Sequence, residues 1–301
     1  MILDKNFIKK YNSSLSSNVK LSNYSWFNLG GTAEYFYKVK DINQLKEFLL
    51  ELNKKNIKTT ILGAGSNTLF RDNGVKGVVI KLGNNFSYTK IHKKNIIKVG
   101  AATPDRLVAN FAKENGLGNL EFLSCIPGSI GGAVIMNSGC YENDISKVLV
   151  SIQAIDKKKL SEVEIKKEDI KFFYRGTNLS EDLIIISVKL KGSSSKKEDI
   201  EKKQFNLIQK KKLSQPSQIK TCGSTFKNIS NEKKAWMLIK QAGCENYKEG
   251  DAVISQKHCN FFVNNGGAKS SDIENLIKKV KKRVFEKTGI NLELEIKIIG
   301  D

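Results

Sequence analysis

The sequence has few of the residues that usually carry hydrolytic or metal-dependent chemistry. Its 301 residues include two histidines, His92 and His258, and five cysteines, none of them in a Cys-x-x-Cys pair. An odd number of scattered cysteines argues against a disulfide framework, and neither residue type has the spacing of zinc ligands. The sequence therefore predicts reduced thiols and no bound metal.

Long apolar runs are also absent. No stretch of about 18 apolar residues could cross a bilayer as a helix, and the charged N-terminal segment MILDKNFIKKYNSS lacks the apolar core of a signal peptide. Hydrophobic residues make up 40% of the chain and charged residues 27%, as in ordinary globular proteins. We expect a cytoplasmic, monomeric protein with no membrane partner, and its length favours about two domains.

Arginine is scarce although positive charge is plentiful. The formal net charge is +20, yet only four of the 51 basic residues are arginines: Arg71, Arg106, Arg175 and Arg283. Such charge would suit a nucleic-acid-binding protein, but the lysines are spread over every segment without a zinc-finger or RNP-like pattern. We interpret the charge as a solvated surface and expect no nucleic-acid partner. Where arginine does occur, its planar fork can hold a carboxylate.

Apolar periodicity predicts mixed helices and strands, an α+β protein. A helix capped by Asp41 is expected at 42–55, and strands are expected at 57–62, 77–82, 95–100, 148–155 and 183–190. A second helix is expected after Thr103 as its cap, with Pro104 as its first residue. This helix should end at Gly116 and bury one stripe of side chains: Leu107, Val108, Phe111 and Ala112.

Composition also suggests where the chain divides. The stretch KGSSSKKED (191–199) is the best linker candidate, and a lysine-rich helix follows at about 198–212. The last third predicts a smaller lobe with helices near 232–242 and 271–288 and an alternating terminal strand at 292–299. The expected divisions are an N-terminal extension (1–20), a two-part region (21–190, as about 21–75 and 76–190), a linker and helix (191–205) and a C-terminal domain (206–301).

The first glycine-rich loop is LGAGSNTLFRDNG (62–74), which directly follows a predicted strand. Gly63 and Gly65 would let consecutive backbone N–H groups turn inward around phosphate oxygens, with Ser66 and Asn67 adding side-chain donors. The loop lacks the third glycine of a Rossmann fingerprint and the lysine of a P-loop. A purely structural turn therefore stays open.

The second loop, IPGSIGGAVIMNSGCY (126–141), carries four glycines in twelve residues. That density exceeds what a turn requires, and backbone approach to a flat or phosphorylated ligand explains it better than tight packing alone. Two such loops about sixty residues apart predict a long ligand held at several points, such as a dinucleotide.

Ser224 lies in TCGSTFKNIS (221–230), without a Gly-x-Ser-x-Gly turn or a histidine close to it in sequence. A nucleophilic serine needs an adjacent base, so this setting does not predict one.

Both glycine-rich loops resemble the FAD-binding motifs of the UDP-N-acetylenolpyruvoylglucosamine reductase family, in its shorter type II form. The similarity continues through FFYRGTNL, SQPSQIKTCGSTFKNI, AWMLIKQAGC, ISQKHCNFFVN and LELEIKIIG, and covers roughly residues 20–301. It implies an FAD-binding region of the PCMH/VAO type and a C-terminal substrate-binding domain. It also implies FAD as cofactor, NADPH as co-substrate and UDP-N-acetylglucosamine enolpyruvate as substrate, in peptidoglycan precursor synthesis.

The resemblance also assigns residues. It implies cofactor binding by Gly63, Ala64, Gly65, Ser66, Asn67, Pro127, Gly128, Ser129, Gly131, Gly132, Asn137 and Gly139. It implies Ser224 as the proton donor to the substrate, with Arg175 and Glu295 managing the substrate carboxylate. Candidates for substrate binding are Lys212, Lys227, Asn228, His258 and Asn260.

Alternatives and departures accompany these assignments. Arg175 could instead form a structural ion pair, Glu295 could be a solvated strand residue, and His258 could be a packed histidine. Thr177, Ile229 and Lys297 depart from the serine, proline and arginine expected at their positions, and Thr177 leaves the fine positioning near Arg175 open. Another flavoprotein of the same fold, acting on a different substrate, is the alternative function.

Overall fold

The computed structural model describes residues 3–230 and 232–301. The chain forms two compact units, each assembled from separate segments. Unit 1 comprises the chain up to Ser16, Phe36–Ala64 and Gly77–Lys211, and unit 2 comprises Ser17–Tyr35, Gly65–Lys76 and Lys212–Asp301. The domain boundaries expected from the sequence remain predictions.

Helices occur where apolar periodicity predicts them. Those expected at 42–55, 198–212 and 271–288 are confirmed as α2, α6 and α8. The α-helices are α1 (Lys5–Tyr11), α2 (Ile42–Lys54), α3 (Asp105–Glu114), α4 (Ile130–Ile135), α5 (Ile145–Val148), α6 (Lys197–Ser214), α7 (Ala235–Gln241) and α8 (Ser270–Thr288). The 3₁₀ helices are η1 (Leu21–Tyr24), η2 (Asn84–Phe86), η3 (Glu121–Cys125) and η4 (Lys167–Asp169).

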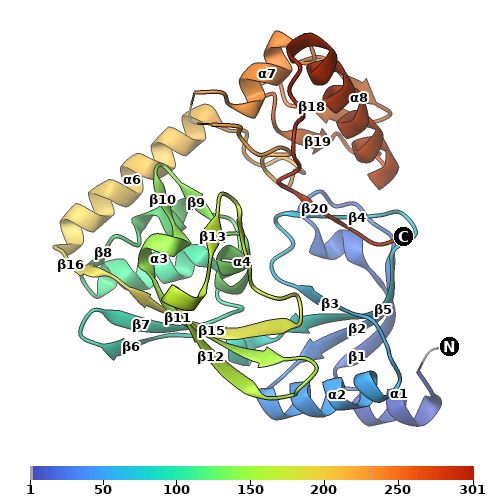
Figure 1. The fold of residues 1–301 in the computed structure, drawn as a ribbon, viewed down its shortest axis with the longest axis vertical. Coiled ribbons are helices and arrows are strands. Elements are labelled where there is room, and N and C mark those ends of the chain that lie inside the picture. The colour runs from blue at the N-terminus through green and yellow to red at the C-terminus, as the bar shows by residue number, and fades with distance from the viewer. Residues whose placement is uncertain (1–2, 231) are drawn as a thin grey trace. The chain divides into compact units, whose positions relative to one another are not determined.

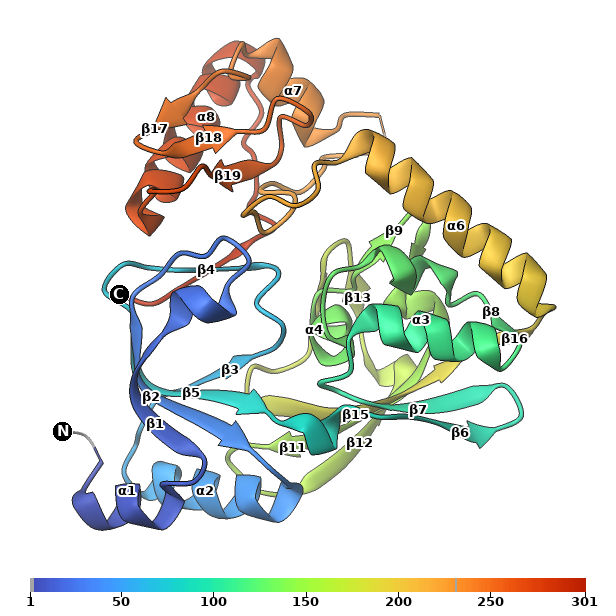
Figure 2. The ribbon, with the colours of Figure 1, turned by 180° about the vertical axis from the view of Figure 1, so that it is seen from behind.

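Helix α2 begins and packs as its sequence predicts. The Asp41 carboxylate accepts a hydrogen bond of 2.9 Å from the backbone N–H of Gln44, which satisfies a donor that has no partner inside the helix. One face of the helix is buried, and Phe48 stacks on Tyr37 with the ring centroids 3.7 Å apart. In unit 1, α1 lies beside α2 (Figure 2).

Two larger sheets contain most of the predicted strands. The first has the order β1 (Leu15–Lys20), β2 (Thr32–Val39), β5 (Val75–Leu82) and β3 (Thr59–Leu62), with β3 and β5 parallel. The second has the order β12 (Glu162–Lys166), β11 (Leu149–Asp156), β15 (Leu183–Lys191), β7 (Ile96–Gly100) and β6 (Thr89–Lys93), and its pairs are antiparallel. The strands expected at 57–62, 77–82, 95–100, 148–155 and 183–190 are thereby confirmed.

The second sheet buries one face in an apolar core. Ile97, Val99, Ile152 and Val188 belong to a core shared with residues of α3 and α4, and both helices lie on one side of this sheet (Figure 1). Period-2 alternation then turns their polar neighbours to the opposite side. Shorter pairs complete unit 1: β8 (Leu117–Gly118) with β16 (Ser193–Ser194), β9 (Gly139–Cys140) with β10 (Asn143–Asp144), and β13 (Phe172–Phe173) with β14 (Gly176–Thr177).

The start of α3 corrects one expectation. Pro104, not Thr103, occupies the N-cap, and the helix begins at Asp105. The Thr103 hydroxyl instead accepts a hydrogen bond from the Tyr88 N–H at 3.0 Å and donates one to the Tyr88 carbonyl at 3.1 Å. Leu107 is also not part of the buried stripe, because 48% of its surface is exposed.

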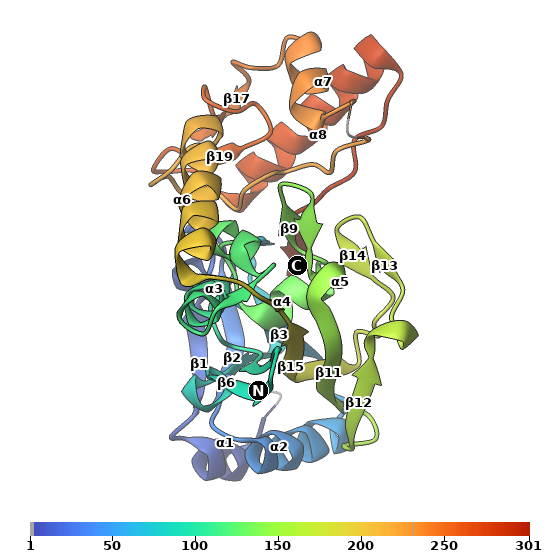
Figure 3. The same ribbon diagram turned by 90° about the vertical axis from the view of Figure 1, so that its left-hand side faces the viewer.

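Unit 2 has its own core around α7 and α8, which lie side by side (Figure 3). Its strands are β17 (Lys248–Glu249), β18 (Ala252–Ile254) and β19 (Phe262–Asn264) in one sheet, and β4 (Thr68–Phe70) paired in parallel with β20 (Lys297–Ile299). The continuous strand expected at 292–299 is wrong, since only its last three residues form β20. Leu294 instead makes an isolated bridge with Phe226. Among the described helices, none is both long and apolar enough to span a bilayer.

Candidate functional site

The first glycine-rich loop presents backbone donors. Within the described part of the chain, no backbone carbonyl accepts a hydrogen bond from the N–H groups of Ala64, Ser66 or Asn67. Gly63 lies in an open position: an added Cβ would meet only the Ser129 hydroxyl, at 3.0 Å. Gly65 is different, since its φ is +70° and a Cβ would lie 1.7 Å from the Tyr24 carbonyl oxygen. The fold therefore explains the glycine at 65, whereas a ligand would explain the one at 63.

The glycines of the second loop also divide into those that the fold requires and those that a ligand would explain. Gly139 is required by packing, because an added Cβ would approach the Asn143 carbonyl oxygen to 2.2 Å, and at Gly131 a Cβ would crowd the Ala101 methyl group and carbonyl oxygen at 3.0 and 3.1 Å. At Gly132 a Cβ would meet only the Ser129 hydroxyl, at 3.6 Å. Pro127 is exposed, and the Gly128 carbonyl accepts a bond from the N–H of Asp105 at 3.2 Å. Ser129 thus lies between two open glycines of unit 1, one from each loop.

The same loop in unit 1 holds Arg175. Asn137 donates to the Phe173 carbonyl at 3.1 Å, and the Arg175 guanidinium donates to the Gly139 carbonyl at 3.0 Å. Arg175 has a left-handed backbone (φ +58°) and lies over the Tyr174 ring at 4.9 Å. The Thr177 hydroxyl donates to the Ile135 carbonyl at 3.3 Å, so threonine retains a hydroxyl anchor here. The hairpin with Arg175 is therefore fastened to the second glycine-rich loop.

Ser224 and Glu295 lie on adjacent segments of unit 2. The N–H of Glu295 donates to the carbonyl of Thr225 at 2.9 Å, directly after Ser224, and the Asn67 side chain donates to the Glu295 carbonyl at 2.9 Å. Among the described residues other than its two chain neighbours, none has a heavy atom within 4 Å of a Cβ built on Gly223, whose φ is +80°. The backbone before Ser224 is thus open on the side where a ligand could approach.

The two glutamates of the terminal segment have different settings. Glu293 is exposed and pairs with Lys227 at 3.3 Å, whereas Glu295 is half-buried beside the Ser224 segment. The geometry therefore favours Glu295 over Glu293 for the role that the sequence predicts beside Ser224.

Two family models match this chain: an FAD-binding domain over residues 33–159, and the UDP-N-acetylenolpyruvoylglucosamine reductase C-terminal domain over residues 215–299. A UDP-N-acetylenolpyruvoylglucosamine reductase of Pelagibacter ubique is 45% identical over 97% of this chain and 98% of its own. The protein of that name from Orientia tsutsugamushi strain Ikeda is 44% identical over 97% of each chain. The chain belongs to the UDP-N-acetylenolpyruvoylglucosamine reductase family.

A solved structure agrees with this assignment. The crystal structure of the reductase from Thermus caldophilus superposes with a TM-score of 0.81 at 31% identity, covering 94% of this chain and 97% of that one. The expected α+β class with an FAD-binding domain of the PCMH/VAO type is confirmed. The roles of individual residues remain predictions.

Several candidate substrate residues of this reductase-family chain hold the backbone around Ser224. The Asn260 amide accepts from the Phe226 N–H at 3.0 Å and donates to the Phe226 carbonyl at 2.8 Å, and only 2% of the residue is exposed. Asn228 accepts from the N–H of Ala235, the first residue of α7. Lys212 is exposed, and its carbonyl accepts a bond from Lys257.

His258 is packed among aromatic rings. Its Nδ1 accepts a bond from the Asn260 N–H at 3.3 Å, and its ring centroid lies 4.8 Å from that of Phe261 and 6.3 Å from that of Trp236. Burial lowers the pKa of His258. The geometry therefore favours a neutral, packed imidazole.

Two charged residues make contacts that the sequence does not predict. Lys81, opposite Leu62 in the parallel β3–β5 pair, donates to the Gly63 carbonyl, and burial, followed by repulsion from Lys38, lowers its pKa. A lone lysine at the end of the apolar run VVIKL was the available signal. Arg71 holds Glu274 through two hydrogen bonds of 3.0 and 3.2 Å, so its fork serves the fold of unit 2.

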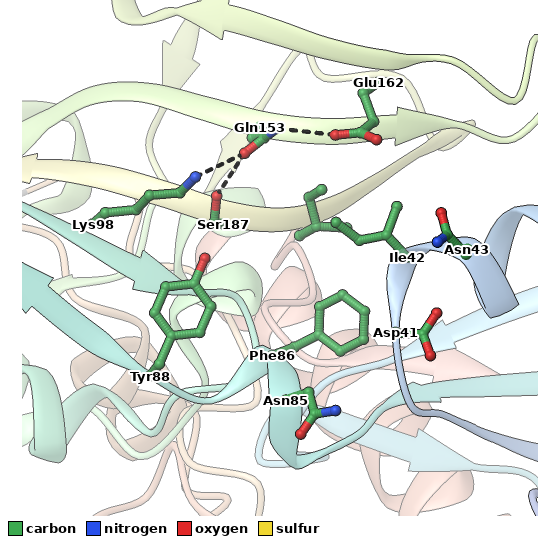
Figure 4. A pocket seen from close by; sticks show the side chains of 11 residues that line it. Asp41, Ile42, Asn43, Asn85, Phe86, Tyr88, Lys98, Gln153, Glu162 and Ser187 are labelled. Atoms are coloured by element: carbon green, nitrogen blue, oxygen red, sulfur yellow. Dashed lines mark hydrogen bonds between the residues drawn. The ribbon is translucent and has the colours of Figure 1, made fainter.

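A polar pocket of about 490 Å³ lies in unit 1 on the face of the second sheet opposite the α3–α4 core. Figure 4 shows Gln153 at one side of the pocket, hydrogen-bonded to Lys98 at 3.1 Å, Ser187 at 3.2 Å and Glu162 at 3.1 Å. None of the predicted site residues lines this pocket. Its lining includes no residue of either glycine-rich loop, so the pocket is separate from the predicted cofactor site.

Proposed function

We propose that this protein reduces UDP-N-acetylglucosamine enolpyruvate to UDP-N-acetylmuramate, with FAD as cofactor and NADPH as co-substrate. The observation that carries the proposal is Ser224 on open backbone next to the Glu295 segment, within the matched reductase C-terminal domain. A role in peptidoglycan precursor synthesis follows from that product. The cytoplasmic location and the monomeric state stay predictions.

The open loops fit the cofactor. A dinucleotide needs donors for its phosphates and backbone that it can approach closely. The free N–H groups of residues 64, 66 and 67 supply the donors, and the open positions at Gly63 and Gly132 beside Ser129 supply the approach. Lys81 adds positive charge at the Gly63 carbonyl. Bound FAD would accept a hydride from NADPH and deliver it to the substrate.

Ser224 would supply the proton. Reduction of the enol ether places hydride on C3 and builds negative charge onto C2 and the adjacent carboxylate, so C2 becomes basic enough to take a proton from a weak acid in contact. This explains a serine without a histidine beside it. Arg175 and Glu295 are proposed to manage the developing charge, an interaction that is stronger in the transition state than in the ground state.

Ser224→Ala separates the two half-reactions. We expect NADPH to bleach the flavin of the variant at the rate seen for the unchanged protein, while reoxidation by the enolpyruvyl sugar nucleotide slows by at least about 10²-fold, the usual scale for loss of a proton donor. Stopped-flow absorbance of the flavin follows both steps. Ser217→Ala, at an exposed serine of the same unit, is the control.

Two results would count against the proposal. Unchanged reoxidation in Ser224→Ala would remove the role given to Ser224. A colourless protein that fails to bind added FAD would remove the reductase function altogether.

A further inference from the structure

Two cysteines stand at the two ends of the second glycine-rich loop. Cys125 is the last residue of η3 and only 5% exposed, while Cys140 is the last residue of β9 and half-buried. The fourteen residues between them, 126–139, include seven of the predicted cofactor-binding positions. Since β9 packs against η3, the loop returns to its starting point.

The two thiols interact. The Cys140 thiol donates to the carbonyl of Phe122 in η3 at 3.4 Å, and it is close enough to Cys125, the last residue of η3, to shift the pKa of that thiol. The Ser124 hydroxyl lies 3.8 Å from the Cys125 sulfur, and the Lys211 ammonium donates to the Cys125 carbonyl. Both thiols therefore lie where η3 packs against β9, beside a lysine of the same unit.

These contacts make the two thiols unequal. Interaction with the Cys140 thiol lowers the pKa of Cys125 against the effect of burial, with further help from Ser124 and the Lys211 charge. The same interaction and burial raise the pKa of Cys140. By contrast, burial raises the pKa of Cys222 and Cys244 to about 11. Cys125 is thus the thiol of the pair that ionises more readily, and the thiolate is the form that reacts.

We propose that Cys125 and Cys140 are an oxidation site, forming a reversible disulfide that closes the second glycine-rich loop into a ring. The oxidant is a peroxide small enough to reach a buried thiolate. The Cys125 thiolate attacks one peroxide oxygen, the O–O bond breaks, and the sulfur becomes a sulfenic acid. The other oxygen leaves as hydroxide, which takes up the proton that the Cys125 thiol released and becomes water. The Cys140 sulfur then attacks the Cys125 sulfur, loses its proton and expels a second water. Two thiols and one hydrogen peroxide thus give one disulfide and two waters.

A disulfide at this position would affect the backbone that holds Arg175. The Gly139 carbonyl, which accepts the Arg175 guanidinium, directly precedes Cys140. A disulfide at Cys140 therefore fixes the backbone that holds this arginine. A thiol reductant restores the open loop, since disulfides exchange with free thiols.

Peptide mapping after peroxide treatment tests the proposal on the intact protein. Trypsin cuts after Lys113 and Lys147 and at no residue between them, so one fragment carries both cysteines and no others. We expect this fragment to become two hydrogen atoms lighter, to resist thiol alkylation and to revert with dithiothreitol. Oxidation of Met136 in the same fragment adds an oxygen and is told apart by mass.

Variants locate the bond. Cys125→Ser and Cys140→Ser should each lose the mass change, while Cys259→Ser, at another half-buried cysteine, should keep it. If either serine variant fails to fold, the fragment of the unchanged protein still decides the question. Two alkylatable thiols after peroxide, or oxidation of Cys125 to sulfinic acid without a disulfide, would overturn the proposal.

Discussion

At the scale of single residues, the two histidines form a natural comparison. His258 is packed against Phe261 and Trp236 and its pKa is lowered by burial, whereas His92 is an exposed residue of β6. An imidazole whose folded-state pKa lies below that of the unfolded chain resists protonation only in the folded protein. As the pH falls below about 6.5, the usual value for histidine, the unfolded chain takes up a proton that the folded chain does not.

The free energy of unfolding should therefore fall as the pH drops from about 6.5 through the folded-state pKa of His258. His258→Gln should flatten this dependence, and at neutral pH it should cost about 1 kcal/mol through lost ring packing. Urea unfolding across this pH range measures both effects. His92→Gln is the matched control and should keep the slope; a slope that follows His92 instead would show that His258 is not the titrating group.

At the scale of elements, substitutions of the loop glycines should distinguish residues that serve cofactor binding from residues that serve folding. Gly63→Ala adds a Cβ that meets only the Ser129 hydroxyl, so the fold should lose less than about 1 kcal/mol, the range of mild substitutions. The same methyl would occupy the space proposed for FAD, and we expect FAD affinity to fall about ten-fold or more. Flavin fluorescence titration of apo-protein and thermal unfolding measure the two quantities.

Gly65→Ala should give the opposite pattern. Its left-handed φ and the 1.7 Å approach to the Tyr24 carbonyl predict destabilisation of several kcal/mol before any effect on the ligand. Equal loss of stability in the two variants would show that Gly63 serves packing. A stable Gly63→Ala protein with unchanged FAD affinity would place the cofactor elsewhere.

Elements that depend on neighbouring residues could be predicted from the sequence, whereas contacts between distant segments could not. Helix α2 was predictable because Asp41 and the apolar stripe act within a few residues of the chain. The cap of α3 was not, because the Thr103 hydroxyl is taken by Tyr88, a partner that only the folded chain brings close. Lys81 at the first loop and the Arg71–Glu274 pair likewise depend on contacts between distant segments. Glycine-rich loops signalled a ligand, but only the structure separates Gly63 from Gly65.

At the scale of the whole molecule, the net charge of +20 acts on every anionic partner. The proposed substrates, NADPH and a sugar nucleotide, are both anions, so a basic protein should attract them before contact. Nucleic acid would be attracted for the same reason. The two kinds of partner can be told apart by kinetics, because only the proposed substrates take part in a reaction whose rate the charge would raise.

Flavin reduction by NADPH should therefore slow as salt is added. Screening shortens the range of the field to about 8–10 Å near physiological ionic strength, and we expect the second-order rate constant to fall roughly ten-fold between low and high salt. Stopped-flow absorbance with sodium chloride measures this rate, and choline chloride at equal ionic strength separates screening from specific ion binding.

A rate that salt leaves unchanged would show that the surface charge does not guide NADPH. A flavin-free protein with salt-sensitive affinity for DNA would instead favour nucleic-acid binding.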